Sequence, residues 1–88
     1  MSYTPKNVQR GVALLDARLP GWRERVDPRT LDLGSECDCV VGQVLGGYTE
    51  GTCLLGLRTT RACSRYGFTT YGRQTFDSLT RAWRKVLA

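Results

Sequence analysis

The stretch from Cys37 to Leu45 constrains the fold more than any other part of the chain. Its apolar residues stand at positions 37, 40, 41, 44 and 45, which is the spacing of one face of a helix. Ser35 precedes the stretch as a candidate N-cap, and Gly46-Gly47 follows as a helix stop signal. The pattern predicts a central buried helix over residues 36–45.

Two longer amphipathic segments flank this stretch and predict helices over residues 5–18 and 74–87. The first opens with Thr4-Pro5, a favourable pair for an N-cap and the first helical position. Both segments repeat apolar residues at spacings of three and four, as a core-facing stripe requires. The predicted core comprises Val8, Val12, Leu15, Val40, Val41, Val44, Leu79, Trp83 and Val86.

Shorter segments complete the expected fold. Four apolar residues are expected to cover one end of the core: Trp22, Val26, Leu31 and Leu33. Thr59 or Thr60 is expected to cap a short helix that ends at Gly67, with Phe68 making the apolar contact of a Schellman motif. Residues 52–57 suit a helical turn or a short strand, and the turn is expected because no second strand with clear alternation is available to pair with them. The fold class is therefore all-α, a small compact bundle of three main helices plus short helical turns, in a single domain over residues 1–88.

Length and hydropathy bound the class of protein further. A chain of 88 residues supplies one modest core and no deep cleft. No segment approaches the roughly 20 apolar residues of a membrane span, and no segment resembles a signal peptide. We expect a protein without a membrane association, located in the cytoplasm.

The net charge of +5 is unevenly distributed. Residues 1–30 sum to +3, residues 31–57 to −4 and residues 58–88 to +6. The candidate binding residues are the basic side chains of the last third: Arg58, Arg61, Arg65, Arg73, Arg81, Arg84 and Lys85. Such a region is typical of a surface for nucleic acid or an acidic protein. The alternative is that arginine is simply the solubilising residue of a chain with eleven Arg and two Lys.

The four cysteines predict neither a metal site nor a catalytic nucleophile. On a helix, the side chains of Cys37 and Cys39 point about 200° apart and cannot chelate one ion. A catalytic cysteine needs a base, usually histidine, and the chain has none. We expect reduced thiols, with Cys37 facing the core and Cys39 on another side of the helix. No metal, cofactor or enzymatic activity is expected.

Three short motifs carry a resemblance: Cys39-Val40-Val41-Gly42-Gln43, Tyr66-Gly67-Phe68 and Leu79-Thr80-Arg81-Ala82-Trp83. In their order and spacing, from about residue 8 to residue 87, they are similar to a group of small proteins from actinobacteria and their phages. The resemblance implies a small helical protein, encoded by a phage or its host and acting in the bacterial cytoplasm. It implies no activity and no functional residue, because none is assigned to the group.

Two functions follow as hypotheses. The first is a non-enzymatic interaction protein that binds a host or phage protein. The alternative is a nucleic-acid-binding regulator that uses the basic C-terminal third, with Gln74 nearby and Tyr66, Phe68 or Tyr71 available for stacking on bases. If the basic third is one working surface, its arginines should lie on one side of the fold.

Overall fold

The computed structural model describes residues 4–70 and 74–87. Over these residues the fold is all-α, as predicted, with no strand. The elements in chain order are α1 (Lys6–Arg18), the 3-10 turn η1 (Trp22–Arg25), α2 (Val40–Leu45), α3 (Tyr48–Leu54), α4 (Thr60–Arg65) and α5 (Phe76–Leu87). Within the described ranges, every helix is too short or too polar to cross a bilayer.

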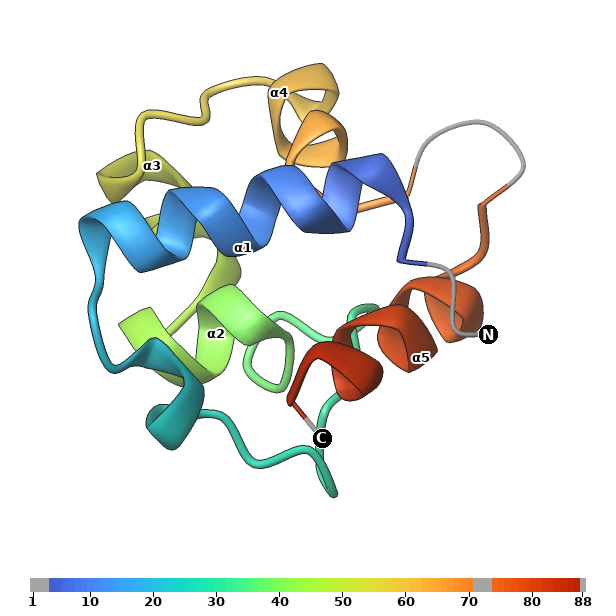
Figure 1. Cartoon of the computed structure of the whole chain (residues 1–88). Coiled ribbons are helices and arrows are strands. Elements are labelled where there is room, and N and C mark those ends of the chain that lie inside the picture. The colour runs from blue at the N-terminus through green and yellow to red at the C-terminus, as the bar shows by residue number, and fades with distance from the viewer. Residues whose placement is uncertain (1–3, 71–73, 88) are drawn as a thin grey trace.

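Helix α1 crosses the middle of the molecule, with α4 along one side and α5 near its N-terminal end (Figure 1). Helix α2 packs on α3 and on η1. The molecule measures 33 × 28 × 23 Å. Its buried apolar side chains belong to one continuous core. This arrangement brings the two ends of the described chain, α1 and α5, against each other.

Trp83 of α5 lies at the centre of the core and is fully buried. Its ring stacks on Phe68 at a centroid distance of 5.7 Å and meets the edge of Trp22 at 5.8 Å. The indole N–H of Trp83 donates to the Gly67 carbonyl at 2.6 Å, and that of Trp22 donates to Asp16 at 2.9 Å. Both buried indoles therefore keep the hydrogen bond that burial would otherwise remove.

Most of the predicted core is confirmed. Seven of its nine residues are buried, and Val12 and Val86 are partly buried at its edge. The four residues expected to cover one end are also buried: Trp22, Val26, Leu31 and Leu33. Amphipathic spacing thus identified the inward faces of α1 and α5 correctly.

The predicted start of the central helix is wrong, because α2 begins at Val40 and not at residue 36. Cys39 has an extended backbone, with ψ at 171°, and serves as the N-cap. Its sulfur accepts the Gly42 N–H at 3.2 Å. Ser35 accepts from the Asp38 N–H and so caps only an isolated turn. Cys37 is consequently exposed and Cys39 buried, the reverse of the prediction.

Three further boundaries differ from the prediction, and one of them is the start of α5, which begins at Phe76 and not at residue 74. The N-cap of α1 is Pro5, not Thr4, and the helix begins one residue later. Of the segment expected to be a turn over residues 52–57, residues 52–54 are instead the end of α3, which spans Tyr48–Leu54. Gly51 allows α3 to lie close against α2, because an added Cβ at Gly51 would collide with Val41 of α2.

Candidate functional site

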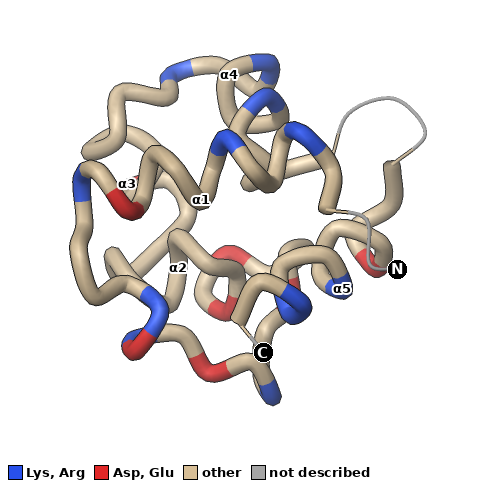
Figure 2. Tube along the Cα trace, viewed as in Figure 1, with Lys and Arg blue, Asp and Glu red and all other residues tan. Residues whose placement is uncertain are grey.

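The structure divides the predicted basic residues between two regions. Arg61 and Arg65 lie on α4, with Arg58 just before it, whereas Arg81, Arg84 and Lys85 lie on α5. The Lys and Arg residues of α4 and of the first half of α1 lie together, apart from those of α5 (Figure 2). Arg81 and Arg84 therefore do not share one side of the fold with Arg61 and Arg65, so the condition for one working surface over the whole basic third is not met. Arg73 and Tyr71 lie outside the described residues.

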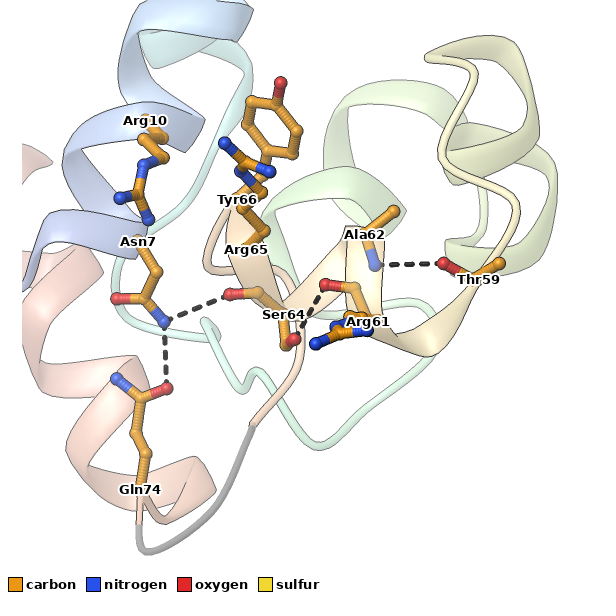
Figure 3. Close-up of a pocket in the computed structure, with 9 residues that line it drawn as sticks. All are labelled: Asn7, Arg10, Thr59, Arg61, Ala62, Ser64, Arg65, Tyr66 and Gln74. Atoms are coloured by element: carbon orange, nitrogen blue, oxygen red, sulfur yellow. Dashed lines mark hydrogen bonds between the residues drawn. The ribbon is translucent and has the colours of Figure 1, made fainter.

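A groove of about 760 Å³ lies between α1 and α4. Figure 3 shows the residues that line it, which carry basic, amide, hydroxyl and aromatic groups but no carboxylate: Asn7, Arg10, Thr59, Arg61, Ala62, Ser64, Arg65, Tyr66 and Gln74. We call it the α1–α4 groove. Its three arginines come from both walls, so a ligand between the helices meets positive charge on two sides.

The local sequence fixes where α4 begins and ends. Thr59 caps the helix by accepting the Ala62 N–H at 3.0 Å. At the other end, Gly67 adopts a φ of 74°, and the Phe68 N–H donates to the Cys63 carbonyl at 3.0 Å. This is the Schellman motif that the sequence predicted. The two ends hold Arg61 and Arg65 on a single short, well-defined helix.

Glycines let α4 lie directly on α1. A Cβ at Gly67 would stand 3.0 Å from the Val8 backbone, so α4 ends against the start of α1. A Cβ at Gly11 would collide with the carbonyl oxygen of Tyr66 and stand 2.9 Å from the Trp83 ring. Close backbone contact therefore sets the distance between the two walls of the groove.

A bridge of amide groups ties the floor of the groove together. The Asn7 side chain accepts the Val8 N–H at 2.9 Å, which fixes which end carries its oxygen. Its nitrogen then donates to the Ser64 carbonyl at 3.3 Å and to the Gln74 side-chain oxygen at 3.0 Å. Asn7 thus connects α1, α4 and the segment before α5 (Figure 3).

The arginines of the groove carry uncompensated charge. The described residues contain one ion pair, between Arg23 and Asp16, with a nitrogen–oxygen distance of 3.1 Å. It lies outside the groove. Arg10, Arg61 and Arg65 are exposed, with no carboxylate within ion-pair distance in the described part of the chain. Like charges on facing walls repel each other, and an anionic ligand would relieve that repulsion.

The basic residues of α5 have a different setting. Arg84 donates to the Pro28 carbonyl at 3.0 Å and to the Leu31 carbonyl at 3.2 Å, and so holds the loop before α2. The neighbouring hollow contains Arg29 and Arg81 but also Asp32 and Asp77. Its charges are therefore of both signs, and Arg84 is engaged in structural hydrogen bonds.

The cysteines divide into an exposed pair, Cys37 and Cys53, and a buried pair, Cys39 and Cys63. Burial raises the pKa of the Cys39 thiol. Burial, followed by a hydrogen bond with Cys63, also raises the pKa of Tyr48. In the described ranges, no three Cys, Asp or Glu side chains stand close enough to hold a metal ion.

Sequence reasoning found one wall of the groove and missed the other. It included Arg61 and Arg65 among the candidate binding residues, and it named Gln74 as a neighbour and Tyr66 as a residue available for stacking on bases. It assigned no binding role to Arg10 or to Asn7. Nothing in the local pattern marks these two residues, because their roles arise only when α1 meets α4.

Comparisons of the chain with protein-family models, with curated proteins and with solved structures found no match.

Proposed function

We propose that the protein is a non-enzymatic nucleic-acid-binding protein whose α1–α4 groove contacts the phosphate backbone. One observation supports this most strongly: three arginines from two helices line a groove whose described lining contains no carboxylate. Guanidinium groups present several fixed N–H donors and form bidentate hydrogen bonds with phosphate. The groove therefore favours a ligand with closely spaced negative charges.

The spacing of the charges also supports a polyanion. Arg61 and Arg65 are one turn apart on α4, a rise of about 6 Å. Arg10 lines the groove from α1, so a strand in the groove has guanidinium groups on both sides for its phosphates. An acidic protein surface, the partner favoured by the sequence alone, offers single carboxylates on mobile side chains and matches this arrangement less well.

The test is fluorescence anisotropy with labelled random-sequence oligonucleotides over a series of salt concentrations. Neutralising three phosphates of a single strand predicts a slope of log K against log salt of about −2. The double variant Arg61→Gln/Arg65→Gln should bind at least tenfold more weakly, and the magnitude of its slope should fall by about 1.4.

The matched control is Arg81→Gln/Lys85→Gln, which removes the same charge from exposed residues of α5. It should retain most of the affinity and the slope of the parent. Equal losses in both double variants would show that net charge, and not the groove, attracts the ligand.

A pull-down from bacterial lysate, with and without nuclease, separates the two kinds of partner. Signal that vanishes with nuclease supports the proposal. A bound protein that survives nuclease, combined with no oligonucleotide binding at low salt, would overturn it in favour of a protein partner.

A further inference from the structure

The shape of the α1–α4 groove bears on which form of nucleic acid it accepts. A duplex reader usually inserts one projecting helix into the major groove, which is about 12 Å wide. Here the arginines stand on both sides of a concavity, and α4 is a six-residue helix that forms one wall. The ligand must enter the protein, which a single strand does more readily than a duplex.

The Tyr66 ring provides an aromatic surface at one end of the groove (Figure 3). It is half-buried, whereas Phe68, two residues on, is fully buried and stacked on Trp83. Of these two aromatic residues, only Tyr66 is therefore open to a base. An aromatic ring beside a basic groove is the usual combination of proteins that bind single strands.

Gln74, at the opposite end of the groove, is oriented by the amide bridge (Figure 3). Because Asn7 directs its nitrogen at Gln74, the Gln74 oxygen faces Asn7 and the Gln74 NH2 group faces away. Among the described residues, no protein acceptor is bonded to that NH2 group. Gln74 thus offers donors only, which suits a phosphate oxygen or a base carbonyl.

Resting on the proposed function, we infer that the groove takes a single strand of nucleic acid, with one base stacked on Tyr66. The phosphates lie on Arg10, Arg61 and Arg65, and Gln74 donates to an acceptor further along the strand. Stacking requires only the face of a base, so the binding should tolerate many sequences.

The experiment compares one oligonucleotide in three forms at the same salt concentration: single-stranded, paired with its complement, and with abasic sites in place of its central nucleotides. For the parent protein, the single strand should bind at least tenfold more tightly than the duplex. The abasic form should bind several-fold more weakly than the intact strand, although its phosphates are the same.

The variants Tyr66→Leu and Tyr66→Phe complete the test, with far-UV circular dichroism to confirm that each is folded. Tyr66→Leu should bind the intact and abasic strands equally, and Tyr66→Phe should distinguish them as the parent does. Because this comparison is made within each variant, a general loss of stability does not imitate the result.

The outcomes separate the two proposals. A duplex that binds as tightly as the single strand, or an abasic penalty that persists in Tyr66→Leu, would overturn the single-strand inference and leave phosphate binding intact. No salt-dependent binding of any form would overturn the proposed function itself.

Discussion

Gly11 stands at the point where the backbone of α1 meets the end of α4. In most exposed helix positions, replacing glycine by alanine stabilises the helix by about 1 kcal/mol. At Gly11 an added Cβ would collide with the Tyr66 carbonyl and press on the Trp83 ring at 2.9 Å. The close contact therefore reverses the ordinary preference of a helix for alanine over glycine at this position.

We expect Gly11→Ala to lower the free energy of unfolding by about 1–3 kcal/mol, the usual cost of overpacking. Urea denaturation measures the change. Lys6→Ala, at an exposed position of the same helix, is the control and should lie within about 0.5 kcal/mol of the parent. A Gly11→Ala variant as stable as the parent would show that α1 and α4 are further apart than described.

Cys39 links stability to alkaline pH. Burial holds its thiol pKa above the ordinary value, so the folded state keeps a proton that the unfolded state releases first. The free energy of unfolding should therefore be at its full value below about pH 9 and should fall as the pH rises further. Tyr48 acts in the same direction at higher pH, because its pKa is also raised.

Urea denaturation at pH 7 and pH 10 measures this dependence. Cys39→Ser removes the thiol but keeps an atom that accepts the Gly42 N–H, so it should lose less stability at pH 10 than the parent does. Cys37→Ser, which changes an exposed thiol, should lose as much as the parent. Equal losses in the two variants would assign the alkaline sensitivity to Tyr48 or to the net charge.

Helix α5 is the element that holds the core together through one side chain. Trp83 contacts Phe68 and Trp22 and donates to Gly67, so it joins α5 to the end of α4 and to η1. Trp83→Ala should cost about 3–5 kcal/mol. That loss is a large share of the 5–15 kcal/mol typical of native proteins.

Thermal and urea denaturation test this expectation, and Trp83→Phe serves as a variant of intermediate cost. The phenyl ring keeps part of the apolar contact but loses the bond to the Gly67 carbonyl, so its cost should lie between those of the parent and Trp83→Ala. A Trp83→Ala variant that melts like the parent would place Trp83 outside the core.

At the scale of elements, the sequence predicts α1, α4 and α5 well because their signals are local. Their apolar stripes, together with the Thr59 cap and the Gly67 stop, act within a few residues of one another. The start of α2 depends on distant partners instead. The Glu36 carbonyl accepts from Tyr48 at 2.9 Å, and the Asp32 N–H donates to Asp38 at 3.1 Å. These bonds hold residues 32–39 in turns despite their helical spacing.

In the candidate site too, residues marked by local spacing were predictable and residues that depend on distant partners were not. Arg61 and Arg65 were found because their spacing within α4 is visible in the sequence. The facing wall on α1 was missed because its link to the segment before α5 is a hydrogen bond between Asn7 and Gln74, which are 67 residues apart in the sequence. Likewise, the separation of Arg81 and Arg84 from the α4 arginines depends on how α5 packs, which the charge count does not indicate.

The whole molecule has one core, and both tryptophans belong to it. We expect a single cooperative unfolding transition, as is usual for a domain of this size. Tryptophan fluorescence and far-UV circular dichroism should therefore report the same midpoint. Two separated midpoints would show that part of the helical structure unfolds independently of the Trp22–Trp83 contact.

The Asn7–Gln74 bond means that the groove exists only when both ends of the described chain are in place. A ligand held there binds the folded state alone and should lower the population of the globally unfolded state. The amide protons of Gln43 and Gly46 donate to the Cys39 and Gly42 carbonyls along α2, outside the groove, and should then exchange with deuterium more slowly when an oligonucleotide is bound. Slowing confined to α1 and α4 would indicate that the groove opens on its own, without unfolding of the core.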